Sequence, residues 1–368
     1  MTAFRKAAPA LAGVALAFAA TPSFASTFKE FRDWWAACDN LRNCSAYGFD
    51  AVLTGGSYIR IERGGAPAAN PKIMVSVDAG EGVTFKLAFD DPALPGLPSD
   101  ALRGEDGEAT DLRRISFTGG SADTLITSLR KAKEIVVTRI DPPGRKSDTP
   151  VTRISLSGAA AALLWIDEQQ KRLDTTTAFI RRGNKPASSI PPQPRPTVVV
   201  AAKGLSGDAA EKKPSPREEA VVKEKGRQLC GEGDEGEFEN ADALSADSWL
   251  YSFKCPGSSG AYNFGYTFLI ARAGQPQAAR QPVLRWPVKI GDLQTDSDSE
   301  RFATNPQFSN ADMTLTTFSK GRGIGDCGTE EIWVFDGKGF RLLEVKMMPH
   351  CRGVPLDDWP VLYRAERK

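Results

Sequence analysis

The sequence predicts a mainly β protein with a few helices (α+β), built as two β-sandwich-like domains that disulfides stabilise. Three features carry this prediction: short runs of alternating apolar and polar residues, six cysteines in a chain of 368 residues, and a proline-rich segment near the middle. Alternation with a period of two is typical of strands that have one buried face. The proline-rich segment divides the chain into two parts, each of ordinary domain size.

The first part, residues 27–185, contains several strand signals and two helix signals. From Val83 to Phe89 apolar residues alternate with their neighbours, as expected of a half-buried strand. Further strands are predicted over residues 59–61, 73–77 and 134–140. Helices are predicted from Ser121 to Lys133 and from Ser157 to Leu173, each with its serine as the cap. This part is therefore expected to be an N-terminal β-rich domain with two helices.

The last part, residues 222–368, is more plainly β. Apolar residues alternate from Phe264 to Ile270, which predicts a strand. Residues 332–335 and 340–347 flank Asp336–Gly339, a stretch of turn residues, and we expect a hairpin there. This part is expected to be a C-terminal β-rich domain.

A proline-rich linker is predicted over residues 186–221. Its prolines are closely spaced, above all in Ile190–Pro196. Proline has no backbone donor and favours an extended polyproline conformation, so this segment is not expected to join a packed core. The alternative is a long surface loop within a single domain.

The N-terminus has the features of a signal peptide over residues 1–25. Arg5 and Lys6 precede an apolar, alanine-rich run over residues 7–20, and Ser23–Ala25 supplies a small-x-small cleavage pattern. That run is too short for a retained anchor, and no later stretch approaches the roughly 18 apolar residues of a spanning helix. The mature protein is therefore expected to be periplasmic or secreted, without a transmembrane anchor.

The six cysteines of an exported chain predict structural disulfides. Cys38 and Cys44 are the only two before the linker and are expected to pair. The four after the linker allow three arrangements. The favoured one is Cys230–Cys255 with Cys327–Cys351. In that arrangement the second bond joins the two ends of the predicted hairpin. No Cys-x-x-Cys pair supports metal binding or redox chemistry.

Composition and single residues argue against several function classes. The formal net charge is +1, which gives no general attraction to nucleic acid. His350 is the only histidine, so metal centres built from several histidines are excluded. Its position beside Cys351 favours a structural or surface role over catalysis. No Gly-x-Ser-x-Gly nucleophile elbow is present. We therefore predict no catalytic residue, no metal ligand and no cofactor.

Four residues of the first domain form a candidate binding surface. Trp34 and Trp35 are adjacent, and Arg60 and Arg63 lie in a predicted strand. Tryptophan and arginine concentrate binding energy at protein interfaces. The alternative is that one tryptophan belongs to the core and that the charges line the solvated face of the strand.

A glycine-rich loop in the second domain supplies two more candidates, Lys320 and Arg322. The alternating glycines between Lys320 and Gly325 would let successive amides turn inward and bind an anion. The alternative is a flexible loop anchored by Cys327, since glycine is more common in turns than in ligand sites.

Several motifs resemble those of a bacterial family. They are Phe31–Asn40 followed by Cys44, Ser57–Gly65, Ser157–Leu173, Asp326–Gly328 continuing through Trp333 to Cys351, and Trp359-Pro360. Together they resemble the uncharacterised domain-of-unknown-function family 1176 over nearly the whole mature chain. The first half also resembles, more weakly, the invasion-associated locus B family of exported bacterial proteins. The resemblance implies a periplasmic protein of Gram-negative bacteria with a β-sandwich-like first domain, and it implies no catalytic residues.

The expected function is that of a periplasmic binding or interaction module of the cell envelope, with an envelope protein or a small ligand as its partner. One alternative is an envelope hydrolase that uses carboxylates such as Asp326, Glu330 and Glu331, because paired acids can perform acid–base catalysis. Glu330 and Glu331 are consecutive and point to opposite faces of a strand, which weakens that alternative. Another is a secreted inhibitor of a cell-wall enzyme that presents the loop Lys320–Gly328.

Overall fold

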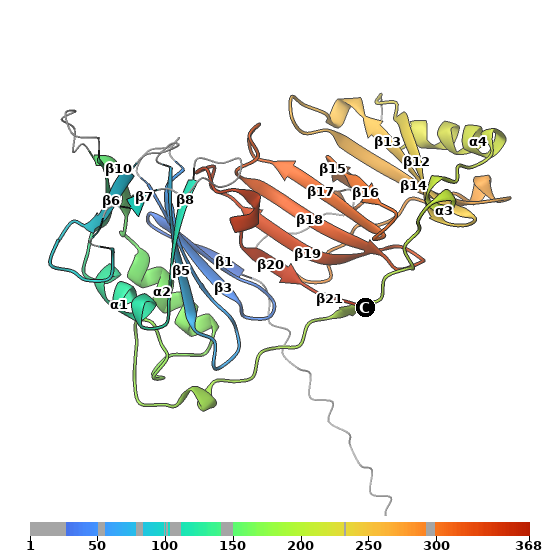
Figure 1. Cartoon of the computed structure of the whole chain (residues 1–368). Coiled ribbons are helices and arrows are strands. Elements are labelled where there is room, and N and C mark those ends of the chain that lie inside the picture. The colour runs from blue at the N-terminus through green and yellow to red at the C-terminus, as the bar shows by residue number, and fades with distance from the viewer. Residues whose placement is uncertain are drawn as a thin grey trace, which may run out of the picture.

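The computed structural model describes most of the chain and shows a mainly β protein with few helices (Figure 1). The described residues are 27–50, 56–78, 84–98, 100, 102–103, 112–140, 150–231, 233–291 and 299–368. The predicted signal peptide, residues 1–25, lies outside these ranges. Within them, none of the helices combines the length and the apolar character needed to cross a membrane.

A six-stranded antiparallel sheet forms the centre of the first half, residues 27–185. Its strands, in spatial order, are β1 (Thr27–Phe31), β2 (Trp34–Cys38), β3 (Cys44–Phe49), β4 (Tyr58–Arg63), β5 (Pro71–Asp78) and β8 (Leu112–Thr118). All five residues of β2 are buried. A strand is buried at every position only when both faces of its sheet are covered, so this sheet is an inner layer.

A second sheet and two helices cover one face of this layer. The sheet runs β10 (Pro150–Ser155), β9 (Glu134–Ile140), β6 (Thr84–Phe89) and β7 (Leu102–Arg103), and the helices are α1 (Gly119–Leu129) and α2 (Ala159–Gln169). Ile59 and Ile61 of β4 pack in one core with Leu125 of α1 and Leu163 of α2. The predicted strands and both predicted helices are therefore confirmed.

The predicted helix caps are wrong by one to three residues. Thr118 caps α1, and Ser121 instead completes the capping box. Gly158 caps α2 with a φ of 103°, a conformation that suits glycine. A Cβ there would lie 1.8 Å from the carbonyl oxygen of Phe31, so only glycine lets α2 begin this close to β1.

The C-terminal half, residues 222–368, contains two further antiparallel sheets. One is β12 (Glu237–Ser245), β13 (Ser248–Cys255), β14 (Gly265–Arg272) and β15 (Phe302–Thr304). The other is β16 (Gln307–Ser309), β17 (Thr314–Lys320), β18 (Gly328–Phe335), β19 (Phe340–Met348) and β20 (Val361–Arg364). Strands β18 and β19 pair from Gly328 with Met348 to Phe335 with Phe340, which confirms the predicted hairpin.

Helices are few in this half and in the segment that precedes it. They are α3 (Asp208–Glu211) and α4 (Pro216–Arg227). Val222 of α4 packs on Trp249, Tyr251 and Phe253 of the four-stranded sheet. Short 3₁₀ helices cover Ala187–Ser189, Pro256–Ser258, Pro276–Ala278, Ser299–Arg301 and Leu356–Asp358.

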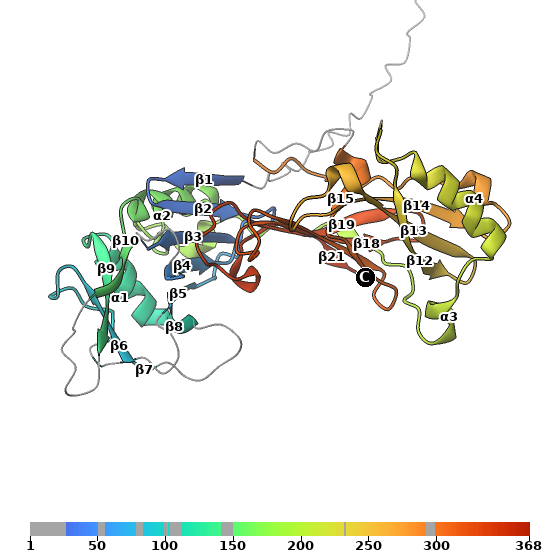
Figure 2. The ribbon, with the colours of Figure 1, turned by 90° about the horizontal axis from the view of Figure 1, so that it is seen from above.

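The two halves share one hydrophobic core. Trp35 and Tyr47, on the remaining face of the six-stranded sheet, belong to the same buried cluster as Trp333 and Tyr363 of the five-stranded sheet. The two sheets lie side by side in both ribbon views, with β20 in contact with β2 (Figures 1 and 2). This contact explains why the six-stranded sheet is buried on both faces.

The proline-rich segment crosses from the first half to the C-terminal half as an extended chain (Figure 1). Its strand β11 (Val198–Val199) pairs in parallel with β21 (Glu366–Arg367). Val199 is only 8 % exposed and belongs to the shared core. The prediction that no part of residues 186–221 joins a packed core is therefore wrong, because a two-residue strand carries an apolar side chain into it.

Three disulfides join segments that the fold brings together. They are Cys38–Cys44, Cys230–Cys255 and Cys327–Cys351. The first joins β2 to β3, and the third closes the open end of the β18–β19 hairpin. This is the pairing that the sequence favours.

Candidate functional site

A polar cleft of about 330 Å³ lies where the first half meets the loop between β19 and β20. Eight residues line it: Arg32, Asp33, Trp34, Phe49, Asp50, Ser155, His350 and Arg352. The first six come from the β1–β2 turn and from the ends of β2, β3 and β10, and the last two come from the C-terminal half. The cleft therefore needs both halves of the chain.

The wall formed by the β1–β2 turn is fixed by hydrogen bonds. Arg32 has a φ of 56°, the left-handed conformation that closes the tight turn between β1 and β2. The Ser155 hydroxyl donates to Asp33 Oδ2 at 2.6 Å. The Trp34 indole N–H donates to the Ser155 carbonyl oxygen at 2.9 Å. Gly48 lies opposite Trp34 on β3 and leaves the space that the indole ring occupies.

Asp50 is the most deeply buried charge in the cleft, with 3 % of its surface exposed. Its Oδ2 accepts a hydrogen bond from the Thr152 hydroxyl at 3.3 Å. Its Oδ1 has no hydrogen-bond partner among the described residues. Burial raises the pKa of Asp50, and the backbone of Ser57, the Thr152 hydroxyl and the positive charge of Arg352 oppose that rise. A buried carboxylate oxygen without a donor is costly, so this atom is poised to accept a hydrogen bond from a ligand.

His350 contributes a second buried atom without a partner. Its ring lies among aromatic side chains, with centroids 5.5 Å from Phe49 and 6.2 Å from Trp35. Its Nε2 lies 3.5 Å from Glu30 Oε1 but has no hydrogen bond among the described residues. Burial lowers the pKa of His350, which favours the neutral form of the imidazole. The lone histidine is thus a half-buried cleft residue, not a surface residue.

The candidate surface predicted from Trp34, Trp35, Arg60 and Arg63 is not an exposed surface. All four residues are buried. They lie on the six-stranded sheet, whose two faces are both covered, so neither strand face is left to solvent. Trp34 alone lines the cleft.

Arg60 points to the boundary between the two halves. Its guanidinium forms an ion pair with Asp358 at 3.1 Å. Tyr47 donates to the Asp358 carbonyl oxygen at 2.6 Å, and Tyr58 donates to the Asp358 carboxylate. Arg114 pairs with the same carboxylate at 2.9 Å. These contacts join the two halves.

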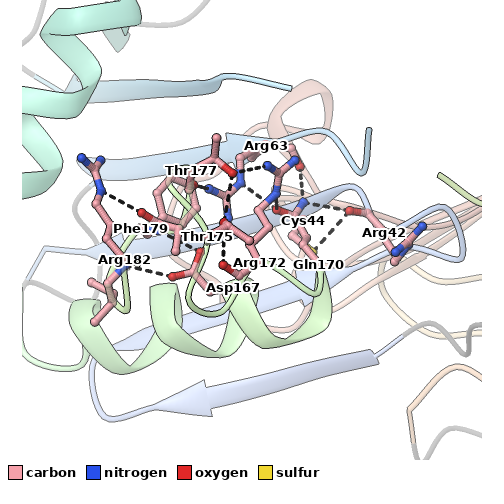
Figure 3. Close-up of polar contacts among 12 residues, drawn as sticks. Arg42, Cys44, Arg63, Asp167, Gln170, Arg172, Thr175, Thr177, Phe179 and Arg182 are labelled. Atoms are coloured by element: carbon pink, nitrogen blue, oxygen red, sulfur yellow. Dashed lines mark hydrogen bonds and ion pairs between the residues drawn. The ribbon is translucent and has the colours of Figure 1, made fainter. Parts of the chain in front are cut away.

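Arg63 belongs to a buried network that fixes α2 to the sheet (Figure 3). It donates to Asp167 at 2.8 Å and to Gln170 at 2.7 Å. Asp167 also accepts from the backbone amide of Phe179 at 2.8 Å, and the Arg63 guanidinium lies 3.5 Å from the centre of the Phe179 ring. Arg172 completes the network through Gln170. The polar groups that dashed lines connect in Figure 3 bond to one another, which indicates a structural role for this network.

The glycine-rich loop presents an apolar side chain at its tip. Arg322 forms an ion pair with Asp326, and the Gly325 amide donates to the Arg322 carbonyl at 3.0 Å. Lys320 lies over the ring of Phe318. Ile324, at the tip of the loop, is 76 % exposed. Of the two positive charges predicted to bind an anion, that of Arg322 is thus paired with Asp326 and that of Lys320 lies near an aromatic ring.

The carboxylates proposed for a hydrolase are each held by their own partners. Arg322 and the Gly353 amide bind Asp326, and they keep its pKa below the usual range despite its burial. Glu330 pairs with Lys346 at 3.1 Å. Glu331 accepts hydrogen bonds from three neighbouring side chains, those of Trp286, Thr317 and Trp333. The cleft is lined by none of these three acids.

Two clusters in the described part of the chain have metal-ligand spacing, and both depend on cysteines. They are Cys230 with Asp234 and Cys255, and Asp326 with Cys327 and Cys351. In each cluster both sulfurs belong to a disulfide. A disulfide sulfur is not the thiolate that binds zinc or iron, so neither cluster suits a metal.

The charged residues of the cleft were missed by sequence reasoning. Arg32 and Asp33 lie within a recognised motif, but nothing in the pattern sets them apart from the rest of the turn. Asp50 and Arg352 are about 300 residues apart and meet only in the folded chain. Only His350 carried a signal, as the single histidine, and its neighbour Cys351 favoured a structural interpretation.

Comparison with known proteins gives the family. The model of the family described as "Protein of unknown function (DUF1176)" matches residues 28–366. An uncharacterized protein, YpfG, of Escherichia coli (strain K12) is 29% identical over 350 residues, which cover 91% of this chain and 92% of that protein. The crystal structure of invasion associated protein b from Bartonella henselae resembles this chain with a TM-score of 0.27 and 15% identity, over 39% of this chain and 98% of that one. The resemblance read from the motifs is confirmed, and the chain belongs to the DUF1176 family of proteins of unknown function.

Proposed function

We propose that this protein is an exported binding protein of the cell envelope and that the cleft between its halves holds a small polar ligand. The observation that carries the proposal is a pair of buried atoms on residues that line one cleft, Asp50 Oδ1 and His350 Nε2, neither of which makes a hydrogen bond among the described residues. Small-molecule sites are typically concave and contain a few polar groups that fix the ligand's orientation. A ligand that hydrogen-bonds both atoms would recover the cost of burying them.

Export is supported by two features of different kinds. The three disulfides are of the sort that persist in the periplasm or outside the cell. Residues 1–25 have the charge, apolar run and cleavage pattern of a signal peptide. Mass spectrometry of the protein from separated cell fractions tests export. A periplasmic protein that begins at Ser26 would support the proposal, and a cytoplasmic protein with free thiols would contradict it.

Binding accounts for the cleft better than hydrolysis does. Asp33 accepts a hydrogen bond from the Ser155 hydroxyl, and the positive charge of Arg352 acts on Asp50. A hydrolase would need an acid and a base on either side of a bond, with their pKa values set apart by their environments. Holding a ligand requires only that donors and acceptors meet it, which these residues can do.

The test is a thermal-shift screen of small polar compounds, followed by calorimetry on the full mature chain. A compound bound in the cleft should lose about tenfold or more in affinity in Asp50→Asn, which removes the charge and keeps the shape. Asp312→Asn, an exposed aspartate in the C-terminal half, is the matched control. A set of binding compounds whose affinities are all unchanged in Asp50→Asn would overturn the assignment of the site.

A second candidate function is inhibition of a cell-wall enzyme by the loop Lys320–Gly328. The favouring observation is Ile324, a large apolar side chain displayed at the tip of a loop that an ion pair and a disulfide hold in shape. A rigid loop loses little entropy on binding. A lysozyme inhibition assay tests it: Ile324→Asp should abolish inhibition, and a wild-type protein without inhibitory activity would exclude lysozyme as the target.

A further inference from the structure

We infer that the ligand of the cleft is a zwitterion, with its cationic group at Asp50 and its anionic group at Arg352. An amino acid or a short peptide with free ends has this chemistry. The inference rests on the proposed function, because it names the class of ligand for the same cleft.

The first argument is the balance of charge in the cleft. Two guanidiniums, Arg32 and Arg352, and two carboxylates, Asp33 and Asp50, line one space of about 330 Å³. Arginine and carboxylate ordinarily form short, often bidentate pairs when they share a site. Among the described residues, however, neither arginine makes an ion pair within 4.0 Å, with these carboxylates or with others. Opposite charges that face one cleft without pairing leave each free for a ligand group of the opposite sign.

The second argument concerns the cationic end of the ligand. Asp33 already receives the Ser155 hydroxyl, so one of its oxygens is in use. Asp50 offers a buried oxygen that has no hydrogen-bond partner among the described residues. An ammonium group donates three hydrogen bonds, and it carries the positive charge that compensates a buried carboxylate. A neutral hydroxyl would satisfy the hydrogen bond but would bring no positive charge to the buried carboxylate.

The third argument concerns the anionic end. Arg352 acts on Asp50 through its charge, and it comes from the loop that also carries His350. A ligand carboxylate can accept two parallel hydrogen bonds from one guanidinium. The neutral His350 Nε2 can meet the ligand's polar middle, for which peptide N–H and C=O groups are suitable. A cleft of this volume is at the lower end of the range for small-molecule sites, about 300–1,000 Å³.

The experiment is a calorimetric comparison of three related probes on the full mature chain. They are alanylalanine, its methyl ester, which keeps only the cationic end, and N-acetyl-alanylalanine, which keeps only the anionic end. The free dipeptide should bind about tenfold or more tightly than either blocked form. In Arg352→Gln the free dipeptide should bind no more tightly than the ester. In Asp50→Asn it should bind no more tightly than the acetylated form. Lys131→Gln, an exposed lysine in the first half, is the control for lost positive charge.

The outcomes separate the ligand class from the site. If a blocked probe or an uncharged polar compound binds as tightly as the dipeptide, and Asp50→Asn still weakens it, the zwitterion inference is wrong and the cleft stands. If binding of every probe is unaffected by Asp50→Asn and Arg352→Gln, both fail. Absence of dipeptide binding up to about 10 mM also overturns the inference, because two charge-assisted contacts should exceed that affinity.

Discussion

Arg60 of β4 and Asp358 of the C-terminal half form an ion pair at 3.1 Å across the boundary between the halves. Both residues are buried, and the hydroxyls of Tyr47 and Tyr58 converge on the same aspartate. Nothing local in the sequence links β4 to residues 298 positions later. This cluster therefore sets how the two halves meet, and with it the shape of the cleft.

Removal of this aspartate should destabilise the whole chain. Asp358→Ala leaves Arg60 buried next to a single remaining carboxylate, that of the more exposed Glu62. Breaking a buried pair by removing one partner costs about 3–5 kcal/mol. Denaturant unfolding should show a loss of that size, whereas Arg364→Gln, which breaks an exposed pair with Glu344, should cost about 0–1 kcal/mol. Equal losses in the two variants would contradict the role given to Asp358.

The buried network of α2 predicts a similar contrast within the first half. Asp167→Ala leaves Arg63 without its carboxylate and the Phe179 amide without its acceptor. The free energy of unfolding should fall by about 3–5 kcal/mol. Asp174→Asn, which weakens an exposed pair with Arg181, should change it by less than about 1 kcal/mol. A stable Asp167→Ala protein would show that the network is dispensable.

The disulfides should differ in their contribution to the free energy of unfolding according to the length of the loop that each one closes. Cys38 and Cys44 are separated by 6 residues, and Cys327 and Cys351 by 24. In the chain-entropy model the shorter loop contributes about 2 kcal/mol and the longer about 3.5 kcal/mol. Paired alanine variants of each bond, compared by urea unfolding, should reproduce this order. The reverse order would show that native packing, and not restriction of the unfolded chain, dominates.

The lone histidine predicts a pH dependence of stability. Burial lowers the pKa of His350 in the folded chain, whereas in the unfolded chain it stays near 6.5. Between these two values the unfolded state binds more protons, so the free energy of unfolding should rise as pH rises through that window. His350→Gln should lack this component. Urea unfolding of both proteins between about pH 5 and 8 measures the difference, and parallel profiles would contradict the burial of the imidazole.

The sequence predicts where the strands and helices lie, but it does not predict which faces of the strands are buried. Alternation of apolar residues located β6 and β14, and the turn residues 336–339 located the β18–β19 hairpin. Local patterns of this kind report whether a strand has a buried face. They do not report what covers the other face. The residue types of Trp34, Trp35 and Arg60 therefore suggest a binding surface, whereas the structure places all three in the interior.

The cleft could not be predicted, for a related reason. Its charged residues come from the β1–β2 turn, the end of β3 and the loop after β19, and no spacing along the chain brings these together. That Asp50 Oδ1 has no hydrogen bond within the described part of the chain is a property of the fold and not of the residue type. The disulfides were predictable because export and chain division reduced the choices to a few.

The single imidazole provides the most direct test of the cleft as a ligand site. Because His350 is the only histidine, its side-chain nitrogens give one set of signals in a ¹H–¹⁵N spectrum of the full mature chain. Titration with alanylalanine should shift these signals in a saturable way, and the shift should disappear in Asp50→Asn. If the dipeptide binds by calorimetry while the imidazole signals stay in place, the ligand lies elsewhere and the cleft is not the site.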